Sequence, residues 1–331
     1  MMHGIQFSEG PIPDEFPERN FMEDLASPGE RPDARVITID KHGAISGHVA
    51  LWWKETPEHE GSRVGAIGGF HAATPDACGQ VLDAACERLT QAGCRLAVGP
   101  MNGNTWRRHR FIIESNGRGS YFMETRHPAA WPCWWRDAGF SELSRYRSAA
   151  LPLDGNRTVS AETMQRLAAR GVTIRPLDMT RFDDELKTIF ELSLTGFPEN
   201  FLYTPIEAPE FFGAYGKIRP HLDPDFVRIA ERDGRPCGFV FCMPDLDATK
   251  RGEKPALIVK TLAVDPASRR FGLGSVLVDD VQTIAHAKGY REAIHATQNE
   301  TNNVSRITGR HAATWFRRYG LFAKTLPRVS I

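Results

Sequence analysis

The second half of the sequence alternates short apolar runs with two amphipathic stretches. Runs rich in β-branched and aromatic residues predict strands, and apolar residues spaced three and four apart predict helices. A capping box at residues 180–183 is expected to open the first helix, and Gly289 to end the second. Asp233-Gly234 is typical of a tight hairpin turn. The expected strands cover residues 173–176, 226–230, 237–242, 256–264, 292–295 and 317–324, and the helices cover 182–194 and 277–285.

The first half repeats much of this order. A predicted helix patterned by Val81, Leu82 and Leu89 ends at Gly93, and residues 92–95 align without gaps on residues 288–291. This indicates an internal duplication of one α/β unit. A turn at 154–156 precedes a further predicted helix, so we expect two domains, residues 1–155 and 156–331. The strands expected in the first half cover residues 35–39, 48–53, 64–70 and 96–98.

Length and charge narrow the class of protein. A chain of 331 residues corresponds to about two domains of ~150 residues. Its 41 basic and 41 acidic side chains balance, so we expect no nucleic-acid partner and no attraction to an anionic membrane.

No apolar run approaches the ~20 residues of a membrane span, and the first residues lack a signal pattern. The six scattered cysteines predict reduced thiols and a cytoplasmic location. Common metal-binding motifs are absent from the sequence, so no metal is expected.

A glycine-rich loop stands between an expected strand and an expected helix. Its sequence is Arg269-Arg270-Phe271-Gly272-Leu273-Gly274. Backbone N–H groups at a helix N-terminus favour an anion such as a pyrophosphate, and glycine lets the backbone approach it. The two arginines either add charge at the rim or are solvated. An isolated Gly-x-Gly is more typical of a simple helix entry, but the flanking elements favour phosphate binding here.

Residues 262–275 resemble the acyl-CoA-binding motif of the GNAT superfamily of N-acyltransferases. The motif core, Arg-x-x-Gly-x-Gly, matches at Arg269, Gly272 and Gly274. The resemblance implies an α/β (α+β) fold with a mixed, mostly antiparallel sheet flanked by helices. The duplicated layout resembles a tandem GNAT protein with two copies of this fold. Segments 99–102, 205–207 and 243–245 are similar to a largely uncharacterised bacterial subgroup.

The resemblance also implies where an acyl-CoA co-substrate binds, acetyl-CoA or another. Backbone groups of Leu262 and Val264 would pair with the pantetheine arm. Asn302 is the nearest match to an asparagine that contacts the cofactor in the family, or it caps the following helix. Backbone amides would hold the pyrophosphate at Arg269, Arg270, Phe271, Gly272, Leu273, Gly274 and Ser275.

The first copy lacks this loop. The ungapped alignment places Ala73, Asp76 and Cys78 where the second copy has Arg269, Gly272 and Gly274. Pro75 supplies no N–H, and the Asp76 carboxylate would repel a phosphate. We therefore expect one cofactor site, with the first half as a scaffold that walls the acceptor pocket.

Acyl transfer to an amine needs an oxyanion donor, an acid for the leaving thiolate and a base for the amine. The resemblance implies that a backbone N–H on the strand ending at Val264 stabilises the oxyanion. The tyrosine that many family members use as acid is missing from residues 304–311, so Tyr319 and Tyr203 are candidates, or packed aromatics. His295 and Glu300 are candidate bases. His295 could instead be a core histidine, and a water chain could replace both.

Aromatic and acidic residues of the second half predict the acceptor pocket, or alternatively an aromatic core under a loop. They are Phe197, Glu199, Asn200, Phe201, Tyr203, Glu207, Glu210, Phe211 and Phe212. The basic run at 106–110 contacts a polyanion or an acidic peptide, or it is a solvated loop.

Two functions follow from these residues. The first is an acyl-CoA-dependent N-acyltransferase with a small-molecule or peptide amine as acceptor. We expect the transferred group to be acetyl rather than another acyl group, and not an aminoacyl group. The second is a non-catalytic acyl-CoA-binding sensor or interaction module. A homodimer is compatible with the sequence, which leaves the oligomeric state open.

Overall fold

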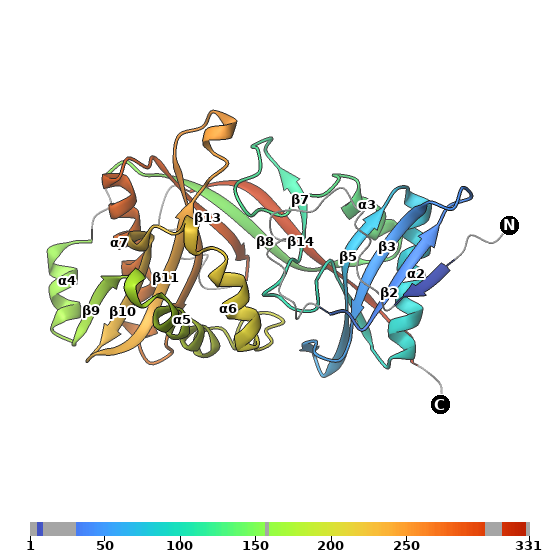
Figure 1. The fold of residues 1–331 in the computed structure, drawn as a ribbon, viewed down its shortest axis with the longest axis horizontal. Helices are drawn as coiled ribbons and strands as arrows, with labels where there is room; N and C mark the ends of the chain where they lie inside the picture. The colour runs from blue at the N-terminus through green and yellow to red at the C-terminus, as the bar shows by residue number, and fades with distance from the viewer. Residues whose placement is uncertain (1–4, 9–30, 156–158, 302–312, 329–331) are drawn as a thin grey trace.

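One mixed β-sheet runs through the computed structural model, which describes residues 5–8, 31–155, 159–301 and 313–328 (Figure 1). The strands follow the order β1-β2-β3-β5-β6-β14-β8-β13-β12-β11-β10-β9, with β4 beside β5 and β7 beside β14. Their bounds are β1 Ile5–Ser8, β2 Ala34–Ile39, β3 Ile45–Trp52, β4 Glu58–His59, β5 Ser62–Ala72, β6 Leu96–Gly99, β7 Phe111–Ser115, β8 Ser141–Pro152, β9 Val172–Pro176, β10 Val227–Arg232, β11 Arg235–Pro244, β12 Ala256–Val264, β13 Glu292–Asn299 and β14 Thr314–Thr325.

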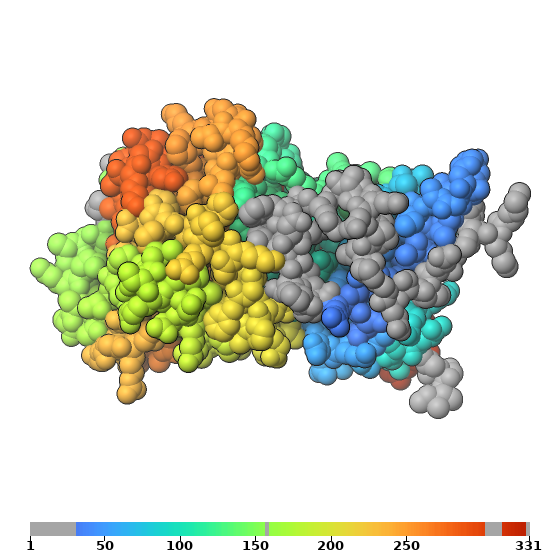
Figure 2. All heavy atoms as spheres, viewed as in Figure 1, coloured from blue at the N-terminus to red at the C-terminus, as the bar shows by residue number. Residues whose placement is uncertain are grey.

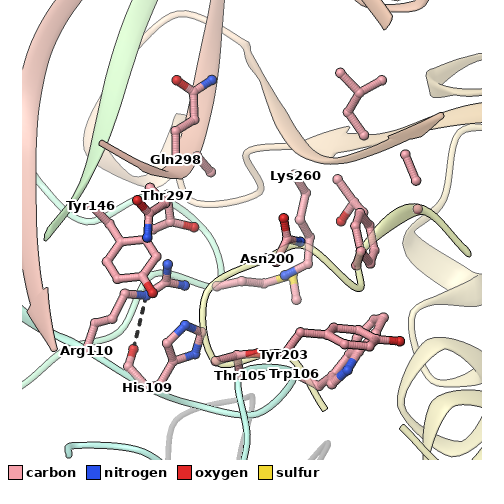
Figure 3. A pocket seen from close by; sticks show the side chains of 18 of the residues that line it. Thr105, Trp106, His109, Arg110, Tyr146, Asn200, Tyr203, Lys260, Thr297 and Gln298 are labelled. Carbon is pink, nitrogen blue, oxygen red and sulfur yellow. Dashed lines mark hydrogen bonds between the residues drawn. The ribbon is translucent and has the colours of Figure 1, made fainter. Parts of the chain in front are cut away.

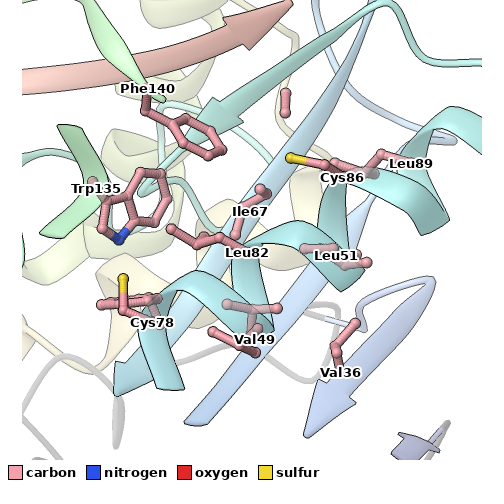
Figure 4. Packing of buried hydrophobic residues seen from close by; sticks show 14 of the residues in the cluster. Val36, Val49, Leu51, Ile67, Cys78, Leu82, Cys86, Leu89, Trp135 and Phe140 are labelled. Carbon is pink, nitrogen blue, oxygen red and sulfur yellow. The ribbon is translucent and has the colours of Figure 1, made fainter. Parts of the chain in front are cut away.

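The first half packs one long helix on its part of the sheet. Strands β2, β3 and β5 are antiparallel, and β5 then pairs in parallel with β6 after the crossover helix α2, Pro75–Gln91. Figure 4 shows Cys78, Leu82 and Leu89 of α2 facing Val49 and Leu51 of β3. Because these side chains are fully buried, this layer forms the core of the first half. The short helix α3, Trp131–Asp137, also packs on α2.

The second half has the same order of elements. Strands β10, β11 and β12 are antiparallel, and β12 pairs in parallel with β13 after the crossover helix α7, Leu273–Ala287. Alternate residues of a strand point to opposite faces, so Phe241 packs with helix α5, Phe182–Gly196, whereas Val240 packs with α7. Helices therefore cover both faces of this part of the sheet. Helix α6, Ala208–Gly216, follows α5 and packs against it, and α4 spans Ala161–Ala168.

The two halves exchange one strand each. Strand β14 comes from the end of the chain but pairs with β6 of the first half, and β8 of the first half pairs with β13 of the second. The two exchanged strands pair with each other from Thr314↔Ala150 to Ala323↔Ser141. Figure 1 shows them crossing the middle of the molecule between two lobes, which Figure 2 colours blue to cyan and green to orange. A boundary near residue 155 stays a prediction, since strands pair across it.

The mixed sheet with flanking helices confirms the expected α/β fold, and the repeated order of elements supports a duplication. The expected capping box is wrong: Asp178 caps a short turn at 179–181 by accepting the Thr180 N–H at 2.9 Å, and α5 begins at Phe182 without a side-chain cap. The sequence analysis missed β7, β8, α3 and α6. None of the helices in the described part of the chain combines the length and apolar character that a membrane span needs.

Candidate active site

A cavity of about 1150 Å³ lies between the two halves. Segments 102–110 and 121–125 of the first half line one side. The α5–α6 loop, β12, the start of α7 and the end of β13 line the other. The first half therefore walls the cavity, as the sequence analysis expected.

The sheet splays open beside the cavity. Strands β12 and β13 pair only from Ala256↔Glu292 to Val259↔His295. Beyond this point β12 still pairs with β11, through Leu262↔Val240 and Val264↔Gly238, but its other edge has no strand partner among the described residues. Leu262 and Val264 both line the cavity. An extended ligand could add to this edge as a strand would.

The glycine-rich loop enters α7 at the same cavity. Gly272 is the N-cap of α7 with φ +70°, a conformation that favours glycine, and a Cβ added there would meet no atom within 4 Å. The Ser275 amide donates back to the Gly272 carbonyl at 3.0 Å. The amides of Leu273 and Gly274 have no acceptor within the part of the chain that the structure describes. Gly272, Gly274 and Ser275 line the cavity, so this open helix start can accept an anion.

The Arg269 side chain fixes this loop to its neighbours. Its guanidinium donates to the carbonyls of Val264 at 3.3 Å and Gly196 at 2.9 Å, and to Glu199 Oε2 at 2.6 Å. Gly196 ends α5 against β12, where a Cβ would lie 2.8 Å from that of Ala263. Arg269 thus joins α5, β12 and α7.

The remaining loop side chains have packing roles. The Arg270 guanidinium lies 5.1 Å from the centre of the Phe271 ring, and Arg170 lies 5.0 Å from it. Leu273 is fully buried in the core under α7. Where these residues contribute to an anion site, they do so through the backbone.

The corresponding loop of the first half has a different structure. Helix α2 has Thr74 as its N-cap, and the Thr74 hydroxyl accepts the Ala77 amide at 3.2 Å. Pro75 opens the helix, and Asp76 lies in its first turn. A side chain and an acid therefore occupy the helix start that is open in the second half.

The basic run at 106–110 forms part of the cavity wall. Trp106 donates its indole N–H to the Thr204 carbonyl at 2.8 Å and packs edge-on against Phe197. Arg107 holds Glu210 with two hydrogen bonds, of 2.6 and 2.8 Å. These contacts join the first half to the α5–α6 loop, so the interpretation as a solvated loop is wrong. They place Phe197, Phe201 and Tyr203 in the cavity lining, whereas Phe211 is fully buried.

Two cations line the cavity: Arg110, which belongs to the basic run of the sequence analysis, and Lys260, which the sequence analysis missed. Lys260 is the extra residue of a β-bulge in β12, between Thr261↔Phe241 and Val259↔Cys242. Burial, and then Arg110, lower the pKa of Lys260 to about 8. A lone lysine inside the apolar run 256–264 was the available signal. Arg110 follows a loop and has φ +79°, which no sequence pattern indicates.

Tyr319 lies in a buried polar cluster that borders the cavity. Its hydroxyl donates to Glu124 and lies 3.0 Å from Ser148 Oγ and 3.1 Å from the Tyr121 hydroxyl. Arg317 Nε donates to the same Glu124 oxygen at 3.0 Å. Burial, with Tyr121 and Glu124 nearby, raises the pKa of Tyr319 well above its usual value. Burial also raises the pKa of Glu124. Tyr319 is therefore both a packed aromatic and a protonated group at the cavity.

The two predicted bases do not line the cavity, although 296–299 of the same strand do. His295 is 2% exposed and faces α7, where its Nε2 lies 2.8 Å from Gln282 Nε2. This is a core position, because side chains alternate along β13. Glu300 lies 3.4 Å from Arg318 Nε in an ion pair. Asn302 lies outside the described residues.

Comparison with known families identifies part of this chain. Residues 186–307 match the family model described as "Acetyltransferase (GNAT) family". This part of the chain is similar to GNAT acetyltransferases. The match spans α5 to the end of β13 and includes the glycine-rich loop. Bacterial ceramide synthase from Caulobacter vibrioides is 27% identical over 89 residues, which are 27% of this chain and 23% of that protein. The chain thus matches less than a quarter of this curated relative.

Two solved structures share the fold over most of the chain. The GCN5-related glucosamine N-acetyltransferase region of a fungal multi-domain GH3 β-N-acetylglucosaminidase has a TM-score of 0.59 and 14% identity, covering 98% of this chain and 38% of that one. A GCN5-related N-acetyltransferase from Sphaerobacter thermophilus has a TM-score of 0.52 and 13% identity, and the match covers 90% of this chain and 82% of that one. At such identities the likeness shows the fold alone.

Proposed function

We propose that the chain is an acyl-CoA-dependent N-acyltransferase that transfers an acyl group to an amine. Acetyl is the acyl group proposed first, and an aminoacyl group is not proposed. One observation carries the proposal: the open helix start at Gly272 to Ser275 and the unpaired edge of β12 face the same cavity. A small-molecule or peptide amine is the proposed acceptor, with no nucleic acid, membrane or metal. A cytoplasmic location and a homodimer stay predictions.

The donor groups of this site suit acyl-CoA. The Gly274 amide lies at the cavity and offers a hydrogen bond to the pyrophosphate, and the α7 dipole favours its negative charge. Leu273 is fully buried, so a role for its amide stays a prediction. The edge of β12 at Leu262 and Val264 offers backbone groups to the amides of the pantetheine arm. The thioester then lies further back along β12, toward Lys260 and the splayed end of β13.

The reaction proposed here is direct attack in a ternary complex. The amine nitrogen attacks the thioester carbonyl, the tetrahedral oxyanion collapses, and the C–S bond breaks as the thiolate leaves. A backbone N–H of β12, the strand ending at Val264 that the family resemblance indicated, is the proposed oxyanion donor. No cysteine is among the described residues that line the cavity, so an acyl-cysteine intermediate has no support there.

Proton transfer is assigned to cavity residues and water. Tyr319 is the proposed acid for the leaving thiolate, because it borders the cavity and its raised pKa keeps it protonated at neutral pH. Glu124, which accepts the Tyr319 hydrogen bond, can relay the replacement proton. Solvent in the open cavity takes the proton of the amine, since His295 faces α7 instead.

A second candidate function is a non-catalytic acyl-CoA sensor. The observation in its favour is that the Tyr319 hydroxyl is already engaged with Glu124 and Ser148. A sensor would bind acyl-CoA through the same loop but would release no thiol.

Incubation of the protein with acetyl-CoA and a broad amine panel, with detection of free thiol, tests the proposal. We expect thiol release that depends on both the enzyme and one class of amine. Acetyl-CoA binding without release across amines, amino acids and peptides would favour the sensor. Absence of both binding and release would contradict both functions.

A further inference from the structure

Two basic side chains from opposite halves of the chain face the same end of the cavity. Arg110 precedes β7 in the first half, and Lys260 lies in the β12 bulge of the second. Figure 3 shows both side chains reaching toward the same space, near Tyr146 and Asn200. Protein atoms enclose both cations, and the part of each that stays accessible opens to the cavity.

Neither cation forms an ion pair with a carboxylate in the described part of the chain. Two of the other basic residues at the cavity differ in this respect. Arg107 and Arg269 each bind a glutamate, and Arg108 donates to the Arg126 carbonyl at 2.6 Å. Arg110 and Lys260 are therefore a pair of like charges without a protein counterion among these residues.

The fold holds Arg110 in place without neutralising it. Its Nε donates to the His109 carbonyl at 3.4 Å, and its guanidinium lies 4.4 Å from the centre of the Tyr146 ring. His109 is buried, and burial, with Arg110 nearby, lowers the pKa of its imidazole well below the usual value, so it adds no charge. Burial lowers the pKa of Arg110 as well.

Burying two like charges costs folding free energy unless an anion joins them. A guanidinium presents two parallel N–H groups that fit a carboxylate or a phosphate, and an ammonium adds a point charge. Buried charges that lower the stability of the folded protein in this way are typical of functional sites. Lys260 lies on β12 next to the point where β13 splays away, where the proposed reaction places the thioester and hence the attacking amine.

We propose that Arg110 and Lys260 bind an anionic group, a carboxylate or a phosphate, of the acyl acceptor. The acceptor is then an amine that also carries this anion, and the two halves of the chain select it jointly. The identification of the ligand as an acyl acceptor rests on the proposed acyltransferase function. The anion site itself is independent of turnover.

Calorimetric titration tests the site without activity. The probes are N-acetylglycine and inorganic phosphate, with neutral N-acetylglycinamide as the matched control. We expect one or both anions to bind and the amide not to bind. Arg110→Gln and Lys260→Gln should each weaken binding at least tenfold, whereas Arg110→Lys keeps most of it. Lys187→Gln, an exposed charge on α5, is the control and should change nothing.

Thermal melts show whether each variant folds. Equal binding by wild type and by folded Lys260→Gln, or equal binding of the amide, overturns the inference. Thiol release is then compared for amino acids against their carboxamides and for phosphoethanolamine against ethanolamine. Release with uncharged amines alone keeps the acyltransferase but overturns the anion site. Anion binding that requires Arg110 and Lys260, without any release, supports the site and contradicts the enzyme.

Discussion

Arg317 and Glu124 form a buried ion pair, with Nε and Oε1 3.0 Å apart, although 193 residues separate them in the chain. Arg317 lies on the exchanged strand β14, and Glu124 lies in the first half beside the cavity. Arg317 also donates to the Arg118 carbonyl at 2.8 Å and to Ser115 Oγ at 2.6 Å. The pair therefore fixes the last strand of the chain against the first half.

Removal of this buried carboxylate should destabilise the protein strongly. Glu124→Gln leaves the Arg317 guanidinium buried without its counterion, which we expect to lower the free energy of unfolding by about 3 kcal/mol. Glu114→Gln breaks an exposed pair with Arg318 and should cost less than about 1 kcal/mol. Urea denaturation measures both. Similar losses of unfolding free energy for the two variants would show that the buried ion pair contributes no more to stability than the exposed one.

The strand exchange predicts that the halves depend on each other. Residues 1–155 expressed alone lack β14, and residues 156–331 lack β8, so each leaves a long sheet edge without its partner. We expect each half to aggregate or stay unfolded, and the two together to form a soluble complex. Circular dichroism and gel filtration measure this. A cooperative unfolding transition for either half alone would contradict the prediction.

The sequence predicted the elements that one local pattern defines. The run 256–264, the glycine at 272 and the helix after it are contiguous, so their strand, loop and helix could be placed from sequence alone. The same holds for α2, whose apolar face is regular. The fold around the cofactor loop follows from these segments.

The residues that the first half contributes to the cavity could not be predicted in the same way. Strand β8 carries mixed polar and apolar residues without a regular alternation, although it lies between β14 and β13 at the junction of the halves, so no local pattern marks it as a strand. The roles of Glu124 and Arg110 depend on residues more than a hundred positions away. His295 appeared catalytic because it ends the expected strand, but β13 extends to Asn299 and directs it toward α7.

Lys260 should lower stability in the absence of a ligand. Its pKa is about 8 in the folded protein and about 10.5 when unfolded, so the unfolded state binds more protons between these values and stability rises with pH across this window. Lys260→Met should raise the free energy of unfolding near pH 7 by on the order of 1–3 kcal/mol and remove the rise. Denaturation at several pH values measures this, with Lys187→Met as control. A less stable Lys260→Met would contradict the account.

The same titration should affect acceptor preference. Lys260 loses its charge as the pH rises through about 8, and Arg110, the charged group that faces it, keeps its own. The KM ratio of an anionic acceptor to its carboxamide, with each KM expressed as the concentration of unprotonated amine, should therefore increase by several-fold from about pH 7 to about pH 9. Lys260→Arg should remove this dependence of the KM ratio on pH. A rate that instead rises equally for both acceptors in wild type would indicate Lys260 as a base.

Binding of acetyl-CoA to two variants at Gly272 tests the central claim most directly. Asparagine and aspartate have the same size, and both tolerate the φ of +70°, with no atom within 4 Å of the added Cβ. We predict that Gly272→Asn binds acetyl-CoA within a few-fold of wild type in calorimetry. Gly272→Asp should lose at least about a hundredfold in affinity, because its negative charge would lie beside the pyrophosphate and repel it. Equal affinity of the two variants, or no binding by wild type, would contradict an acyl-CoA site at this helix start.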